Sequence, residues 1–309
     1  MVSNSIYKTN QQVKLDVYYV DPFLTDEPGS GNPAAVCIVD VDMPLADLTM
    51  SYIAQYLNQS ETVFARKKAS GEWDLRWYTP AGDSISPGGN GTVALAYVLL
   101  NLIEPELARV RLTCRFSQLD SWAERKDDLV TVVLPSVSAT QINPEFRYIL
   151  SQSFSGYEPH SYLIGEQDLI MVFDSEDEIR DMNPDFSQLV QTNYVAYIVT
   201  AKGDRGGFVY RTFLTSEGKR KWEDPVSARA LMNLLAYWSP LLGGKQDILA
   251  QSLSKRGGEA NCRLADCDGN NCVVVTAKCA IRSGPNRFYF DALGGEFSSD
   301  SAQDPFIWR

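Results

Sequence analysis

The chain has 309 residues, 44% hydrophobic and 22% charged, which is enough for one large domain or two ordinary ones. Its formal net charge of -11, with no basic run longer than the "KRK" at 219–221, disfavours nucleic acid as a partner. No signal-like N-terminus and no stretch of ~18 apolar residues is present, so we expect a soluble cytoplasmic protein that contacts no membrane.

The first third of the chain predicts strands around one helix. Residues 14–23 and 34–42 are rich in β-branched and aromatic residues and are separated by a turn-rich segment, which predicts paired strands. Apolar residues recur at helical spacing from Leu45 to Tyr56, which predicts an amphipathic helix ending near Asn58. Residues 61–68 and 72–85 are again predicted strands.

A glycine-rich segment then precedes an apolar helix. Residues 86–91 read "SPGGNG", and residues 92–103 form an apolar run without further glycine or proline. Glycines there leave the first free N–H groups of a helix accessible, which indicates a site for an anion such as a carboxylate or enolate. The alternative is an ordinary glycine-rich loop. Residues 109–136 follow as predicted antiparallel strands.

The second half repeats this pattern. After a loop-rich region at 137–165 we expect strands at 168–173 and 194–201, with helix-like sequence at 176–191 between them. A strand at 206–215, a loop at 216–227, a second apolar helix at 228–242 and a meander at 261–290 complete the chain. Two halves with one apolar helix each predict two similar lobes with a cleft between them.

Six cysteines in a chain without a signal segment are most simply reduced thiols. Four of them, Cys262, Cys267, Cys272 and Cys279, are separated by four, four and six residues, which matches no compact zinc motif. We therefore predict no metal site.

Several motifs together resemble the phenazine-biosynthesis isomerase (PhzF-like) family. They include "SGNPAAV" at 30–36, "SETVF" at 60–64 and "EDPV" at 223–226, and the likeness extends from about residue 14 to about residue 290. The resemblance implies an α+β, diaminopimelate-epimerase-like fold, in which each lobe is a curved antiparallel sheet or barrel around a central apolar helix. It also implies an active site in the interlobe cleft and chemistry that needs no cofactor.

On this resemblance, residues 1–136 form the N-terminal lobe, joined by the C-terminal segment 293–309, and residues 137–292 form the C-terminal lobe. Glu61 matches the family's general acid/base, and Asp224 matches its second acidic residue. A single carboxyl group can move a proton between two carbons if burial raises its pKa toward the working pH. The alternative roles are local, as a capping residue for Glu61 and a helix cap for Asp224.

The same resemblance implies that the two helix starts bind the substrate through Gly89, Asn90, Gly91, Thr92 and Ser227. Here the chain departs from the family, which carries Cys-Gly-His or Cys-Gly-Asn at the first helix start, whereas this chain has Gly88-Gly89-Asn90. No thiol base is present there, so a two-thiol racemase mechanism is excluded on this alignment. Asn90 cannot exchange protons near neutral pH, which leaves it an orienting role.

Arg229 stands where the family has a small serine. Arginine binds carboxylates bidentately and cannot act as an acid or base, so we expect it to bind substrate. The alternatives are a solvated side chain or an ion pair with Glu61 or Asp224, which would depress their pKa values.

These residues leave three hypotheses open. The first is a cofactor-independent isomerase or cyclase that acts by proton transfer on a small natural-product or amino-acid-derived intermediate. The second is a diverged cyclase that works by shaping its substrate and by hydrogen bonding. The third is a non-catalytic binding protein that kept the fold. In each case the partner is a small molecule, and the sequence leaves a homodimer open.

Overall fold

The computed structural model describes residues 12–41, 45–114, 121–189, 192, 194–215, 221–244, 247–291 and 297–299. Its first half contains β1 (Gln12–Pro22), β2 (Ala34–Ile38), α1 (Asp47–Leu57), β3 (Glu61–Lys67), β4 (Trp73–Tyr78), β5 (Ser84–Ile85), α2 (Gly89–Val98), the π-helical turn η1 (Leu99–Ile103), β6 (Arg109–Cys114), β7 (Ser121–Lys126), β8 (Leu129–Pro135) and β9 (Thr140–Gln141).

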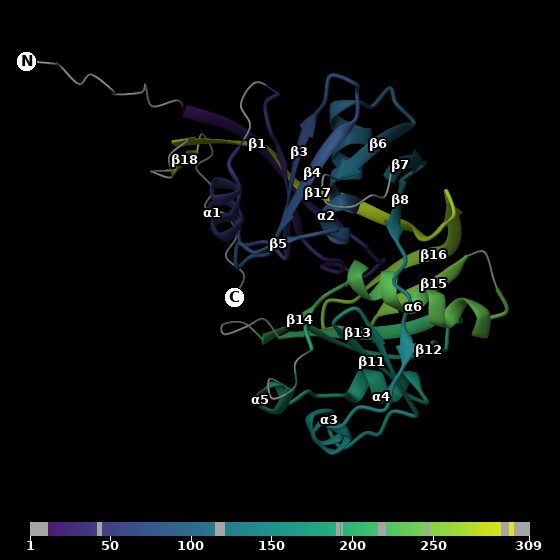
Figure 1. The fold of residues 1–309 in the computed structure, drawn as a ribbon. Coiled ribbons are helices and arrows are strands. Elements are labelled where there is room, and N and C mark those ends of the chain that lie inside the picture. Colours follow the sequence, from purple (N-terminus) through teal and green to yellow (C-terminus); the bar gives the residue numbers. More distant parts are fainter. Residues whose placement is uncertain are drawn as a thin grey trace, which may run out of the picture.

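The second half contains α3 (Arg147–Ser153), β10 (Ser161–Gly165), β11 (Asp168–Val172), α4 (Glu176–Asp181), α5 (Phe186–Leu189), β12 (Ala196–Lys202), β13 (Phe208–Thr215), β14 (Lys221–Asp224), α6 (Ala228–Leu241), β15 (Ile248–Ser252), β16 (Gly258–Cys267), β17 (Asn270–Asp291) and β18 (Phe297–Ser299). Figure 1 shows these elements gathered into two lobes, with α2 in one and α6 in the other.

Strands of the first lobe close into a barrel. Within the described residues its order is β1-β2-β3-β4-β6-β7-β8-β17, and β17 pairs back to β1. The β2–β3 and β4–β6 pairs are parallel and the others antiparallel. Helix α2 contacts strands on several sides of this ring, including β1, β2, β3, β7, β8 and β17.

The second lobe repeats this order and these orientations. Its strands follow as β10-β11-β12-β13-β15-β16-β17, with β11–β12 and β13–β15 parallel and the other pairs antiparallel. Even the short strands correspond, since β5 pairs with β4 as β14 pairs with β13. This is the pseudo-symmetric α+β architecture that the resemblance implies.

Two segments connect the lobes. Strand β17 pairs with β16 of the second lobe and, along its length, with β8 and β1 of the first. Strand β9 follows β8 after residues 136–139 and pairs with β10 of the second lobe. The proposed lobe boundary at residue 136 falls in the β8–β9 connection. Of the segment 293–309, β18 pairs with β17, and the remainder lies outside the described residues.

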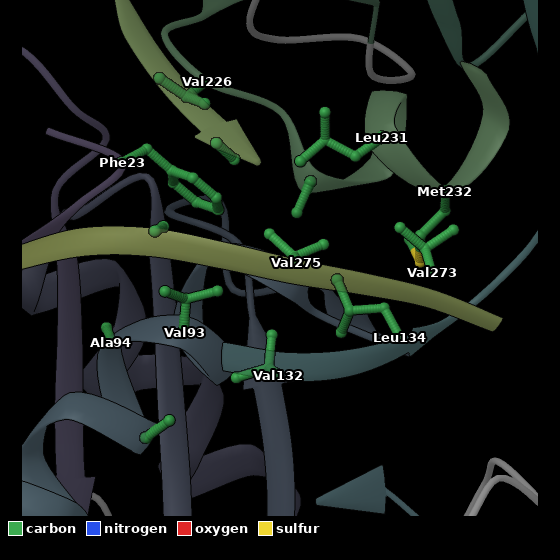
Figure 2. Packing of buried hydrophobic residues seen from close by; sticks show 14 of the residues in the cluster. Phe23, Val93, Ala94, Val132, Leu134, Val226, Leu231, Met232, Val273 and Val275 are labelled. Carbon is green, nitrogen blue, oxygen red and sulfur yellow. The ribbon is translucent and has the colours of Figure 1, made fainter. Parts of the chain in front are cut away.

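Both central helices are buried because they are apolar on nearly every face. In α2 every residue except Tyr97 is buried, and α6 buries nine of its fourteen residues. Figure 2 shows side chains of α2, such as Val93, on one side of β17, and side chains of α6, such as Leu231, on the other. One hydrophobic cluster therefore spans both lobes, which fixes the two helix starts relative to each other.

Three predicted elements differ in detail. The first helix buries Met50, Ile53 and Leu57, whereas Leu48 and Tyr52 of the expected apolar stripe are exposed. The helix-like segment 176–191 is two short helices, α4 and α5, because Pro184 between them cannot continue a helix. The predicted loop 216–227 contains β14, which brings Asp224 to the end of a strand.

The cysteine prediction is wrong for one pair. Cys267 and Cys272 form a disulfide across the turn between β16 and β17, because this hairpin brings their Cα atoms to 6.0 Å. Cys37, Cys114, Cys262 and Cys279 take part in no disulfide among the described residues. No helix in the described part of the chain is long and apolar enough to cross a bilayer.

Candidate active site

A cavity of about 530 Å³ lies where the two central helices begin. Both lobes line it, through the β3 and α2 starts on one side and the β14–α6 segment on the other. The sequence-predicted site residues among its lining are Glu61, Gly89, Asn90, Asp224, Ser227 and Arg229. Among the described residues, no group of three or more His, Cys, Asp or Glu side chains is placed to hold a metal ion.

Glu61 is the first residue of β3 and is 5% exposed. Its Oε1 accepts a hydrogen bond from the backbone N–H of Gly91 at 2.8 Å, in the first turn of α2. The carboxyl group thus occupies the helix start, where unpaired N–H groups and the helix dipole favour negative charge. The sequence assigned these N–H groups to an anionic substrate, but in the structure the chain's own Glu61 takes the Gly91 donor.

Close approach explains the glycines of this segment. A Cβ at Gly91 would lie 2.6 Å from Oε1 of Glu61 and 3.0 Å from Cβ of Val63, so any side chain would displace the carboxyl group. A Cβ at Gly89 would lie 2.2 Å from Cβ of Ala228, at the start of α6. The glycines therefore let the carboxyl group contact α2 and let the two helix starts meet.

Burial raises the pKa of Glu61 to about 8. The hydrogen bond from Gly91 opposes this shift, the nearby Asp224 carboxyl adds to it, and the backbone N–H of Asn90 also opposes it. Desolvation outweighs two N–H donors because the side chain is almost wholly removed from water. Glu61 is consequently protonated in much of the neutral pH range.

Asp224 lies at the end of β14 and is partly accessible where it lines the cavity. Desolvation raises the pKa of Asp224 to about 7, and hydrogen bonds from Ser227 and Asn32 oppose this shift. The Asn32 amide Nδ2 donates to Oδ1 of Asp224 and to the carbonyl oxygen of Val226, each at 2.7 Å. Asn32 belongs to the "SGNPAAV" motif, which was the available sequence signal for it.

Asn90 joins the two lobes at this point. Its Oδ1 accepts from the backbone N–H of Ala228 at 3.2 Å, and Ser227 Oγ accepts from the N–H of Ala230 at 3.3 Å. Neutral side chains therefore cap the start of α6. The N–H of Gly89, at the start of α2, has no hydrogen-bond partner among the described residues.

Arg229 forms an ion pair with Asp168, through Nε and Oδ2 at 2.5 Å. The expected alternative of a pair with Glu61 or Asp224 is therefore wrong. Asn233 Nδ2 also donates to Oδ2 of Asp168, at 3.1 Å. Asp168 and Asn233 carried no local sequence signal, since Asp168 lies 61 residues from Arg229 and only the fold brings them together.

Gly91 and Thr92 lie beneath the cavity surface and are not among its lining residues. Thr92 is buried, its Oγ1 accepts from Nε1 of Trp77 at 3.1 Å, and it bonds the carbonyl of Gly88. These contacts fix the first turn of α2 against β4. The direct substrate contact expected for both residues stays a prediction, and their observed contacts are to other protein groups.

Comparison with known proteins identifies the family of this chain. Residues 20–281 match the family model of the phenazine biosynthesis-like proteins. An uncharacterized isomerase of Pseudomonas aeruginosa is 33% identical over 252 residues, which cover 82% of this chain and 92% of that protein.

Solved structures agree with this. A PhzF-family protein of Enterococcus faecalis superposes with a TM-score of 0.75 at 29% identity, over 89% of this chain and 98% of that one. A hydroxyproline epimerase of Agrobacterium vitis superposes with a TM-score of 0.55 at 12% identity, over 92% and 94% of the two chains. The second likeness concerns the fold alone.

Proposed function

Because the chain belongs to the phenazine biosynthesis-like (PhzF) family, we propose that it is a cofactor-independent isomerase. It moves a proton between two carbons of a small biosynthetic intermediate bound in the interlobe cavity. Glu61 and Asp224 are the acid–base pair in this proposal. The cytoplasmic location and the small-molecule partner expected from the sequence belong to the same proposal.

One observation supports it above the others: two carboxyl groups with pKa values raised to about 8 and about 7 line the same cavity. Groups that titrate near the working pH are the effective proton donors and acceptors. Because Asp224 raises the pKa of Glu61, the two titrate as a pair. Between these pH values the pair holds one proton, so one acid and one base face the substrate together.

The reaction then needs no other proton-transferring group. The ionised carboxyl takes a proton from a C–H bond next to a carbonyl or double bond, and the electron pair of that bond moves into the conjugated system. The other carboxyl returns a proton to a second carbon, which gives an isomer with the same atoms. In this proposal the N–H of Gly89, a residue that lines the cavity at the start of α2, donates to oxygen charge that develops in between.

In this proposal the reaction needs no histidine at position 90, where the resemblance implies histidine or asparagine. Asn90 has no exchangeable proton near neutral pH, and its side-chain oxygen is committed to the N–H of Ala228. Asp224, which matches the second acidic residue of the family, supplies the second titrating group in this proposal. Ring closure that follows this isomerisation would use the same pair, whereas the diverged cyclase, which shapes its substrate and works by hydrogen bonding, would not use proton transfer by this pair.

The test is hydrogen exchange in D₂O, followed by ¹H NMR on a panel of α-amino acids and β,γ-unsaturated carboxylic acids. We expect deuterium to enter carbon in at least one compound, and Glu61→Gln to slow this by about two to four orders of magnitude. The rate should peak between pH 7 and 8, because both groups are protonated below this window and both are ionised above it.

Glu166→Gln is the matched control, since Glu166 is an exposed carboxylate that lines the same cavity. It should leave the exchange rate within about twofold. Unchanged exchange in the Glu61 variant would refute proton transfer by Glu61. Product formation without any exchange would favour the shaped-cleft cyclase, and binding without turnover would favour the non-catalytic protein.

A further inference from the structure

Asp168 is a carboxyl group that the proposed reaction does not use. It is 1% exposed, at the start of β11, and its Oδ2 accepts from both Nε of Arg229 and Nδ2 of Asn233. Its Oδ1 has no hydrogen-bond partner in the described part of the chain. A buried carboxylate is costly unless it is paired, so this side chain holds the guanidinium group firmly.

Asn233 fixes the geometry from the helix side. It is 1% exposed, one turn after Arg229 in α6, and its Nδ2 also donates to the carbonyl oxygen of Arg229 at 3.0 Å. The Asn233 amide therefore links the Arg229 backbone to the carboxylate that binds the Arg229 side chain. Asn233 thus holds the backbone of Arg229 and Asp168 holds its side chain.

The pairing uses only part of the guanidinium group. Nε donates to Asp168, whereas neither Nη group has a hydrogen-bond partner among the described residues. Arg229 lines the cavity and is about one-third exposed there. Two donor groups in a fixed plane are thus available to a ligand, and that arrangement matches a carboxylate.

The charged residues that line the cavity favour Arg229 as the place where an anionic group binds. Four carboxyl side chains line the cavity, Glu61, Asp83, Glu166 and Asp224, and Arg229 is the one cation among its described lining residues. An anionic ligand group would be repelled near the carboxylates that are ionised. The favourable place for it is therefore beside Arg229, the one cation among the described lining residues.

We propose that Arg229, positioned by Asp168 and Asn233, forms a carboxylate-binding subsite that makes the cavity selective for acidic substrates. This rests on the proposed function in one respect only, that the cavity is the substrate site. Arg229 contacts the ligand, and Asp168 and Asn233 are positioning residues. The subsite takes a carboxylate while the reacting carbon lies toward Glu61 and Asp224.

The test uses three matched probe pairs that differ in charge: benzoate and benzamide, anthranilate and anthranilamide, and nicotinate and nicotinamide. Ligand-observed NMR titration measures their affinity for the full chain. In the wild-type protein at least one carboxylate should bind tenfold or more tightly than its amide. Equal affinity in all three pairs would overturn the proposal.

The informative variant combines Arg229→Gln with Asp168→Asn, because removing the arginine alone would strand a buried carboxylate and threaten folding. A Gln–Asn pair keeps a neutral hydrogen bond at this place. We expect the preference for the carboxylate to vanish while amide affinity stays within twofold. A preference that persists in this folded double variant would refute the subsite.

Arg229→Lys tests the positioning role. An ammonium group that pairs with Asp168 has no second planar donor pair to offer, so this variant should also lose most of the carboxylate preference. Full retention would show that the fork held by Asp168 is not the binding element. Glu61→Gln should keep the preference, so binding that depends on Arg229 without Glu61-dependent exchange would uphold the subsite and refute the isomerase.

Discussion

At the start of α2 the Gly91 N–H is bonded to a carboxyl group from a neighbouring strand, whereas the start of α6 is capped by the neutral side chains of Asn90 and Ser227. The lobes otherwise repeat each other strand by strand. The glycines at the start of α2 let the Glu61 carboxyl group approach closely. At the start of α6 the charged residue is Arg229, whose side chain is paired with Asp168.

This difference shows that two lobes with the same strand order can present different chemical groups to one cavity. Symmetric backbones provide two helix starts at one cavity, and the residues at each start decide what faces it. In our proposal the α2 side contributes Glu61, and the α6 side contributes Asp224 together with the substrate-binding Arg229. The comparison can be tested through stability as well as activity, because each helix start depends on a contact that a single substitution removes.

The largest expected effect is on the pH dependence of stability at the α2 start. The unfolded chain releases the Glu61 proton near the ordinary pKa of 4.5, whereas the folded chain keeps it until about pH 8. Stability therefore falls as pH rises through this window and levels off above it. Glu61→Gln lacks this loss, so it should be more stable than wild type at pH 8.5 by on the order of 2–4 kcal/mol.

Urea denaturation at pH 5 and pH 8.5 measures this difference. The two proteins should have similar free energies of unfolding at pH 5, where both folded forms are neutral at this position. A gap between them that shrinks toward high pH would contradict the raised pKa of Glu61. The exposed Glu166→Gln variant is the control and should show no such pH trend.

The next effect concerns the contact between the two helix starts. Gly89→Ala would place a methyl group 2.2 Å from Cβ of Ala228, and we expect it to destabilise the fold by about 1–3 kcal/mol. Combining it with Ala228→Gly removes the clashing methyl group. The double variant should recover at least half of that loss, as measured by chemical denaturation.

The control is Ala228→Gly alone, which we expect to lower the free energy of unfolding by itself. Strictly additive costs in the double variant would mean that the two positions do not touch. A recovered double variant would establish that the glycine of the first helix is required by the second helix rather than by a ligand.

The smallest expected effect is on the α6 cap. Asn90→Ala removes the acceptor for the Ala228 N–H and should lower the free energy of unfolding by about 1 kcal/mol. Ser227→Ala, which removes the acceptor for the Ala230 N–H, is the control on the same helix end and should cost a similar amount. No loss in the Asn90 variant, beside a loss in the Ser227 variant, would exclude the cap across the lobes.

Much of this protein could be predicted from sequence because the signals are local. The periodicity and the apolar runs predicted the main strands and the two central helices, and contiguous motifs such as "SETVF" indicated the family, which the comparisons confirm. Local pattern failed where tertiary packing decides, as in α1, whose apolar Leu48 and Tyr52 face outward because the strands cover its other side.

The sequence by itself determined the fold family, the glycine-rich helix start and the two acidic residues proposed for catalysis, because each lies in a short motif. Only the tertiary structure decided which groups meet. Asn32 reaches Asp224 across 192 residues and Asn90 reaches Ala228 across 138, and Arg229 finds Asp168 on a strand that no motif marks. The first two pairs form where the two lobes meet, and the third forms within the second lobe, so all three depend on tertiary geometry that no stretch of sequence encodes locally.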